Sequence, residues 1–177
     1  MSEEEVILVD AEDRAIGSAG KLAAHLENLR HRAISVLVFD RAGRMLLQRR
    51  ADAKYHSPGL WSNACCTHPR HGEEPAVAAG RRLREEMGIS LPLAFAGRFA
   101  YEAPVGAELW ENEIVHVFTG THDGTHDGEI LPDPDEVGAF GWHEVEALRA
   151  DIAARGALYT PWFRLYAATP WFAAPAA

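Results

Sequence analysis

Residues 74–88 read E-P-A-V-A-A-G-R-R-L-R-E-E-M-G and give the strongest secondary-structure signal in the chain. Small and apolar side chains recur here at intervals of three and four residues: Ala76, Ala79, Gly80, Leu83 and Met87. This spacing is typical of a helix with one buried face, and glycine at position 88 is the residue type that most often ends a helix. We therefore predict a helix from Glu74 to Met87.

Charged residues occupy the last turns of this predicted helix. Arg81 and Glu85 are one turn apart, as are Arg82 and Glu86. Such pairs commonly form salt bridges on a solvated helix face. The same residues could also belong to a site that binds an anion or a metal, and the spacing leaves both interpretations open.

Extended segments lie on both sides of the helix. Residues 33–39 and 45–48, joined by the turn 40–43, predict a β-hairpin, and residues 6–9, 94–101 and 111–119 predict further strands. Residues 21–30 have helix-forming composition, 120–136 are typical of a loop, and 144–154 predict another helix. Together they indicate an α/β (α+β) fold, with a mixed β-sheet sandwiched between α-helices.

The composition limits the classes of partner. With 177 residues and 47% hydrophobic content, the chain is long enough to form a single catalytic domain over residues 1–177. A formal net charge of −9 argues against nucleic-acid and anionic-membrane surfaces. We expect no membrane segment and a cytoplasmic protein, because no long apolar stretch or basic leader is present. No pattern indicates an oligomeric state.

The two cysteines are adjacent, so they cannot join distant segments, and we expect free thiols. In the segment N-A-C-C-T-H-P (63–69), an extended backbone would place Cys66 and His68 on the same side. Cys65 would then point to the opposite side. One thiol is thereby set beside one imidazole.

A pair of glutamates, Glu111 and Glu113, shares one face of the predicted strand 111–119. Two carboxylates this close are costly to bury unless a cation lies between them or one is protonated. His25, His31 and His68 could supply nitrogen ligands to such a cation. Taken singly, each histidine could equally be structural, and the glutamates could form a solvated strand edge.

Basic residues follow directly on the predicted strand 45–48, in Q-R-R-A-D-A-K (48–54). A guanidinium such as that of Arg50 can bind two phosphate oxygens at once, whereas Lys54 would act as a mobile point charge. These cations could clamp a phosphate group or keep a loop soluble.

The ordered set of these short motifs resembles the type 1 isopentenyl-diphosphate isomerases of the Nudix superfamily, from about Val6 to Trp162. The matching segments are 21–25 (KLAAH), 31–35 (HRAIS), 48–51 (QRRA), 58–63 (PGLWSN), 66–69 (CTHP), 81–88 (RRLREEMG), 111–113 (ENE) and 160–162 (TPW). This resemblance implies a Nudix α/β sandwich with a core of about 30–165 and a disordered tail at 173–177. It also implies the interconversion of isopentenyl diphosphate and dimethylallyl diphosphate, a small prenyl diphosphate substrate, in isoprenoid biosynthesis.

The resemblance implies roles for single residues as well. One divalent metal, Mn²⁺, Mg²⁺ or Zn²⁺, would be held by His25, His31, His68, Glu111 and Glu113. Cys66 and Glu113 would transfer protons on opposite faces of the substrate, and Tyr101 and Trp162 would line the hydrocarbon pocket. A Mg²⁺ ion would be held by Glu86 against the diphosphate. The phosphate contacts would be Lys21, Arg50, Lys54 and Arg82.

The predicted helix 74–87 and the residues before it depart from the pattern of Nudix diphosphate hydrolases. That pattern is G-x5-E-x7-R-E-U-x-E-E-x-G-U, where U is aliphatic. The chain keeps Glu73, Glu85 and Glu86, but Thr67 stands in place of the glycine and Arg82 in place of the first helix glutamate. A cation there removes a metal ligand, which makes hydrolysis the less favoured chemistry. The alternatives are a Nudix diphosphohydrolase and a non-catalytic metal- or nucleotide-binding module.

Overall fold

The structure is a computed structural model that describes residues 4–106, 108–124 and 126–174. The elements, in chain order, are β1 (Glu5–Val9), β2 (Ala15–Gly20), α1 (Lys21–Leu26), β3 (His31–Asp40), β4 (Met45–Arg50), β5 (Trp61–Asn63), β6 (Cys65–Thr67), α2 (Pro75–Met87), β7 (Ala94–Pro104), β8 (Trp110–His122), β9 (Val137–His143), α3 (Val145–Arg155), η1 (Gly156–Leu158) and α4 (Pro161–Tyr166).

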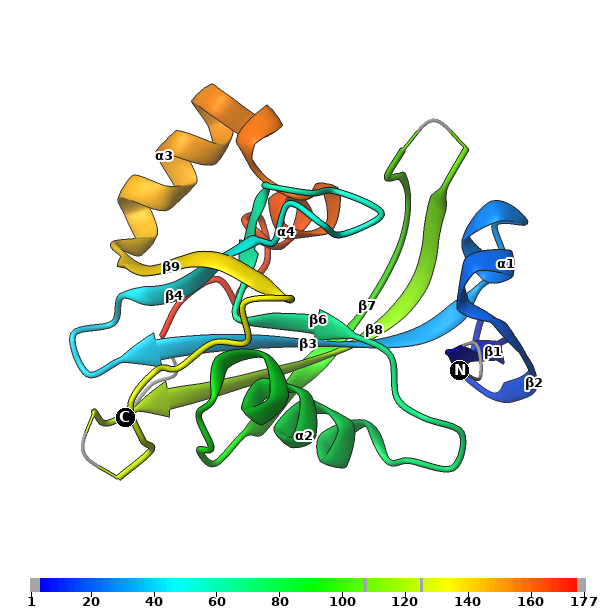
Figure 1. Cartoon of the computed structure of the whole chain (residues 1–177), viewed down its shortest axis with the longest axis horizontal. Helices are drawn as coiled ribbons and strands as arrows, with labels where there is room; N and C mark the ends of the chain where they lie inside the picture. The colour runs from blue at the N-terminus through cyan, green and yellow to red at the C-terminus, as the bar shows by residue number, and fades with distance from the viewer. Residues whose placement is uncertain (1–3, 107, 125, 175–177) are drawn as a thin grey trace.

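The strands form one mixed sheet with β3 at its centre (Figure 1). β3 pairs in parallel with β8 along its whole length, from His31 opposite Glu113 to Asp40 opposite His122. It also pairs antiparallel with β6, which places Cys66 opposite Ser35. The strand that carries the cysteines and the strand that carries the glutamate pair therefore both pair with β3.

Each face of the sheet is covered by helices, because side chains on β3 alternate between two cores. One core joins Ala33, Leu37 and Phe39 to residues of α3 and α4. The other joins Ile34, Val36 and Val38 to α2, and Figure 1 shows α2 and the α3–α4 pair on opposite sides of the sheet. The predicted sandwich of a mixed sheet between helices is confirmed.

Helix α2 begins at Pro75 and ends at Met87, as the sequence predicts to within one residue. Gly88 ends it with φ +72°, a left-handed conformation that glycine adopts without strain, and its N–H donates to Arg84 O at 3.0 Å. Both predicted one-turn salt bridges form, at 3.0 Å for Arg81–Glu85 and 2.8 Å for Arg82–Glu86.

Other predicted elements differ from the structure. Helix α1 ends at Leu26 rather than near residue 30, and Asn28 has a left-handed φ of 54° that a continuing helix does not allow. Strand β8 extends to His122, into the predicted loop 120–136. Strands β2 and β5 and helix α4 were not predicted. Of the predicted tail, residues 175–177 lie outside the described residues.

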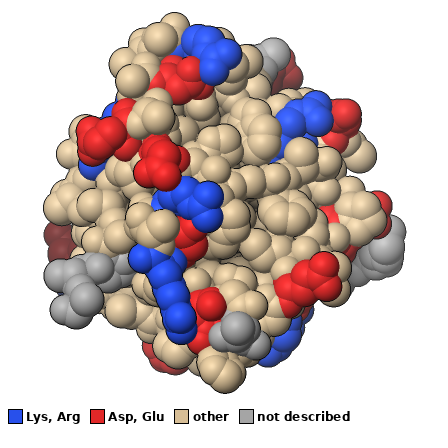
Figure 2. All heavy atoms as spheres, turned by 90° about the vertical axis from the view of Figure 1, so that its left-hand side faces the viewer, with Lys and Arg blue, Asp and Glu red and all other residues tan. Residues whose placement is uncertain are grey.

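Acidic and basic side chains are interspersed on the face shown in Figure 2, so the excess of negative charge does not gather in one patch there. Charged residues also pair with partners four positions away in the sequence, as in Arg155–Asp151 and Arg44–Asp40. Within the described ranges, no helix has the length and apolar character needed to cross a membrane.

Candidate active site

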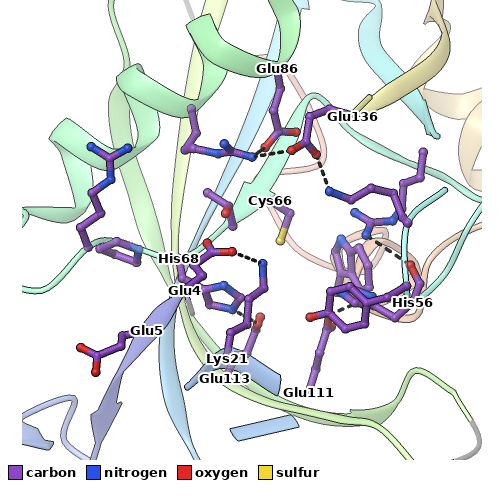
Figure 3. A pocket seen from close by; sticks show the side chains of 18 of the residues that line it. Glu4, Glu5, Lys21, His56, Cys66, His68, Glu86, Glu111, Glu113 and Glu136 are labelled. Carbon is purple, nitrogen blue, oxygen red and sulfur yellow. Dashed lines mark hydrogen bonds and ion pairs between the residues drawn. The ribbon is translucent and has the colours of Figure 1, made fainter. Parts of the chain in front are cut away.

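A cavity of about 270 Å³ opens between α1, β6, β8, α2 and the loop that follows β4 (Figure 3). Ten of the residues predicted from the sequence line it: Lys21, Arg50, Lys54, Cys66, His68, Arg82, Glu86, Glu111, Glu113 and Trp162. The remaining predicted residues, His25, His31 and Tyr101, lie directly behind this wall. The fold therefore brings the whole predicted set together.

Four buried donors form a compact group. Ligand atoms of His25, His31, His68 and Glu113 all lie within 4.8 Å of one another. They come from α1, the start of β3, the segment after β6, and β8, and each is less than a tenth exposed. An octahedral metal with nitrogen bonds of about 2.1 Å places adjacent donors roughly 3 Å apart, and His68 Nε2 lies 3.0 Å from Glu113 Oε1.

The hydrogen bonds of two of these histidines fix their tautomers. His25 Nδ1 donates to Lys21 O at 2.6 Å, and His31 Nδ1 donates to Leu29 O at 2.7 Å, because a carbonyl oxygen can only accept. In a neutral imidazole a donating Nδ1 leaves the lone pair on Nε2, and both Nε2 atoms are buried without a hydrogen-bond partner. His31 Nε2 faces Glu113 Oε1 at 3.4 Å.

Two lone pairs that face each other in a buried site repel unless a cation lies between them. This arrangement fits a divalent metal ion, and backbone carbonyls that orient ligating imidazoles are common around such ions. Burial lowers the pKa of His25 and lowers that of His68 to about 4, so both rings are neutral, the form that binds metals.

The glutamate pair is joined by one tyrosine. Tyr101 Oη on β7 lies 2.6 Å from Glu111 Oε2 and 2.7 Å from Glu113 Oε2. Burial, and then the charge of Glu113, raises the pKa of Glu111 well above its usual range. Burial also acts to raise the pKa of Glu113, but the neighbouring imidazoles of His31 and His68 outweigh it and keep that pKa well below the usual range. The two carboxyl groups are therefore chemically distinct.

The two adjacent thiols point to opposite faces of the sheet, as the alternation on an extended strand predicts. Cys65 is fully buried in the core under α2, with its Sγ 3.5 Å from Glu86 Oε1. Cys66 lines the cavity on the other face (Figure 3). Burial, and then the charge of Glu113, raises the pKa of the Cys66 thiol, which keeps it protonated at neutral pH.

Trp162 forms an aromatic wall of the cavity and is held rigidly. Its Nε1 donates to Ser62 Oγ at 3.0 Å, and Ser62 Oγ lies 3.1 Å from Thr160 Oγ1. The guanidinium of Arg50 lies 5.5 Å from the centre of the indole ring. The indole is almost completely buried, so its face is available only to a group inside the cavity.

Three of the predicted phosphate-binding cations already have carboxylate partners. Lys21 Nζ lies 3.0 Å from Glu4 Oε2, and Lys54 Nζ lies 2.6 Å from Glu136 Oε2. The guanidinium of Arg82 contacts Glu136 as well, at 3.3 Å. In the view of Figure 3, Glu136 and Glu86 lie on one side of the opening and Glu111 and Glu113 on the other. Arg82 and Lys54 thus line the end of the cavity nearest α2 and the loop after β4, whereas Lys21 reaches the cavity from α1.

Comparison with known proteins decides the family. The chain matches the NUDIX domain family over residues 29–163. It is 51% identical over 160 residues to isopentenyl-diphosphate Delta-isomerase 1 of Aromatoleum aromaticum, which covers 90% of this chain and 88% of that protein. The chain belongs to the Nudix family and, within it, to the isopentenyl-diphosphate isomerases. The Serratia proteamaculans isopentenyl-diphosphate Delta-isomerase is 45% identical over 161 residues, 91% of this chain and 88% of that protein.

Solved structures agree on the Nudix fold. The structure of DR0079 from Deinococcus radiodurans matches with a TM-score of 0.69 and 22% identity, covering 86% of this chain and 90% of that one. A MutT protein from Methanosarcina mazei matches with a TM-score of 0.61 and 18% identity, over 77% of this chain and 89% of that one. At these identities the likeness extends to the fold alone.

The Nudix helix of this chain carries arginines against its acidic residues. The guanidinium of Arg81 donates two hydrogen bonds to the carboxylate of Glu73, at 2.7 and 2.8 Å, and forms a salt bridge with Glu85 at 3.0 Å. Arg82 binds both Glu85 and Glu86. The carboxylates that match the hydrolase pattern are therefore already neutralised by arginines of the same helix.

Sequence reasoning missed several residues that line this isomerase-family cavity, among them Glu4, His56 and Glu136. Glu4 and Glu136 pair with the cations, and His56 lies among the histidines and Glu111. Glu4 and Glu136 carry no signal in the sequence, because their partners are 17 and 82 residues away. His56 stands two residues after Lys54, and a lone histidine in a loop predicts nothing by itself.

Proposed function

We propose that this chain is an isopentenyl-diphosphate isomerase that interconverts isopentenyl and dimethylallyl diphosphate by adding one proton and removing another. The observation that supports it most is a single cavity that holds a thiol, a tyrosine-linked glutamate pair and a buried indole. Relatives that are 45–51% identical over most of both chains carry the name isopentenyl-diphosphate Delta-isomerase.

The diphosphate of the substrate would bind at the cationic end of the cavity, to Lys21, Arg50, Lys54 and Arg82. It would compete with Glu4 and Glu136 for these cations. Its binding energy would then position the small hydrocarbon end against the reacting groups. We further propose that a Mg²⁺ ion accompanies the diphosphate beside Glu86, which is buried next to Arg82.

Cys66 and Glu113 would move the protons. Cys66 projects from β6 and Glu113 from β8, with β3 between these strands, so the thiol and the carboxylate reach the cavity from separate elements. The thiol is protonated and the carboxylate ionised, which provides one acid and one base. Tyr101 would hold the glutamate pair in position through its short contacts to both carboxyl groups.

Protonation of an unactivated alkene gives a tertiary carbocation. The face of Trp162 could stabilise such a cation by about 2 kcal/mol when water is excluded, and the indole is 1% exposed. The anionic carboxylate of Glu113 would add electrostatic stabilisation in the same buried site. The cavity must also keep water from capturing the cation, which its burial favours.

His25, His31, His68, Glu111 and Glu113 would hold one divalent metal ion, for which Mn²⁺, Mg²⁺ and Zn²⁺ are the candidates. The bound ion would supply positive charge that allows the two carboxyl groups to stay together in a buried site. We also propose that the protein acts in the cytoplasm, where its two free thiols would remain reduced.

Reaction in deuterium oxide tests the proposal. A proton transposition should place deuterium in a methyl group of dimethylallyl diphosphate and leave both phosphates attached, because the acid exchanges with solvent between turnovers. A Nudix hydrolase would attack phosphorus with water and leave the carbon skeleton unlabelled. Mass spectrometry of the product distinguishes them, and unlabelled carbon with stoichiometric phosphate release would overturn the isomerase proposal.

A further inference from the structure

His56 is a buried histidine in the loop between β4 and β5 and is 7% exposed. Its Nδ1 is buried and has no hydrogen-bond partner among the described residues. A buried polar atom left without a partner costs about 1–3 kcal/mol. Because His56 lines the cavity, a group bound there could satisfy this nitrogen.

The ring is oriented by contacts on several sides. It stacks on His25 with the ring centres 5.7 Å apart and the planes at 28°, and its edge faces Trp162 at 5.9 Å. Arg50 Nη2 donates to the backbone oxygen of His56 at 3.2 Å, which anchors the loop. The imidazole is thus fixed between the histidine group and the indole wall.

His56 Nδ1 lies 3.9 Å from Glu111 Oε1, which is too long for a hydrogen bond. Ligand atoms of His25, His56 and Glu111 nevertheless lie within 4.8 Å of one another, and this group shares His25 with the group formed around Glu113. The predicted ligands therefore divide into two overlapping groups, and Glu111 belongs to the one that contains His56. A cation held by Glu111 would be within reach of His56 as well.

The contact resembles the one in the group around Glu113. His56 Nδ1 lies 3.9 Å from Glu111 Oε1, as His31 Nε2 lies 3.4 Å from Glu113 Oε1, and both nitrogens are buried without a hydrogen-bond partner.

We propose that His56 is a fourth histidine ligand of the metal centre, binding through Nδ1 on the side of Glu111. The proposal rests on the metal site of the proposed function and adds a sixth candidate donor to the five predicted ones. Six protein donors would fill an octahedral ion and leave no position for water, whose presence would endanger a carbocation. Four imidazoles would also shift the preference of the site from Mg²⁺ toward transition metals.

The test counts the ligands directly. Wild-type protein stripped of metal and reloaded with one equivalent of Co²⁺ is compared with His56→Ala, His56→Gln and the control His122→Ala. His122 is similarly buried, but its Nε2 contacts Gly128 O outside the cavity. X-ray absorption gives the number of imidazoles around Co²⁺, and competition with a chelator gives the affinity.

We expect four imidazoles in the wild type and in the control, and three in His56→Ala with at least a tenfold weaker affinity for Co²⁺. Three imidazoles in the wild type, or unchanged affinity in a folded His56→Ala protein, would overturn the proposal. If thermal unfolding shows that His56→Ala does not fold, the number of imidazoles around Co²⁺ in His56→Gln decides the question instead. Metal binding is measured without turnover, so a protein with four imidazoles and no isomerase activity would refute only the proposed function.

Discussion

Replacing Cys66 with alanine should lower the turnover of isopentenyl diphosphate by at least about a thousandfold, whereas replacing Cys65 should leave it near the wild-type value. The first loss corresponds to roughly 4 kcal/mol of transition-state stabilisation, as expected when a proton-transfer group is removed. Cys66 lines the cavity, and its removal takes little from the core. The two variants differ by one position on one strand, so each serves as the control for the other.

The magnitude for Cys65 follows from its surroundings. Its side chain is fully buried among Ala64, Ala78 and Leu83, so deletion of the sulfur leaves a small cavity that should lower the free energy of unfolding by roughly 1 kcal/mol. Loss of the contact from Sγ to Glu86 adds to this cost. The stability effect should thus fall on Cys65→Ala and the catalytic effect on Cys66→Ala.

The assay combines two measurements on each variant: the rate of dimethylallyl diphosphate formation with saturating substrate and Mg²⁺, and the free energy of unfolding in urea. Loss of activity in Cys65→Ala together with near wild-type turnover in Cys66→Ala would refute the assignment of the thiol. Equal, large losses in two well-folded variants would also contradict it, because the strand places only one sulfur in the cavity.

Three other outcomes are expected. Strong chelation should abolish activity and added divalent metal should restore it; full activity in protein shown by elemental analysis to be metal-free would contradict the metal site. Hydrogen bonds from Arg81 lower the pKa of Glu73 to about 2 from its ordinary value of 4.5. The stability lost in Glu73→Gln should therefore be constant above about pH 5 and shrink as the pH falls toward 2, and a pH-independent loss in urea unfolding would show the pairing to be unimportant. Gly88→Ala would place a Cβ 2.5 Å from Leu131 O at φ +72° and should lower the free energy of unfolding by about 2 kcal/mol or more. Gly72→Ala, at φ +76° in open space, should lower it by only about 1 kcal/mol. Equal losses in the two variants would show that the predicted clash at Gly88 does not occur.

Much of the fold could be predicted from local sequence patterns. The period of α2 and its glycine stop placed that helix to within one residue, and alternation placed Cys65 and Cys66 on opposite faces. Strand β2 was missed because A-I-G-S-A-G offers little apolar alternation and pairs at the edge of the sheet with β1. The parallel pairing of β3 with β8 joins segments about 80 residues apart, and no local pattern encodes such a contact.

The candidate site was predicted mainly from the resemblance of short motifs to the isomerase family. The structure places the residues of these motifs in and around one cavity. What the sequence could not supply is the grouping of the ligands. Glu111 and Glu113 look equivalent along a strand, yet the structure places Glu113 beside His31 and His68 and places Glu111 beside His56. That division depends on the path of the loop after β4, which only tertiary packing determines.

The distribution of charge over the two faces of the sheet explains how a Nudix fold could serve proton transfer instead of hydrolysis. On the helix side, Arg81 and Arg82 neutralise the acidic residues of α2, so this helix favours an anionic substrate over a cluster of metal ions. On the opposite side, the histidines and the glutamate pair create a separate cation site at the end of β3 and β8. Cys66 lies on that second face, in the same cavity as Arg82. The diphosphate would therefore be bound beside α2 while the carbon chain extends to the thiol and the glutamates, which keeps the reacting carbons away from the phosphorus atoms.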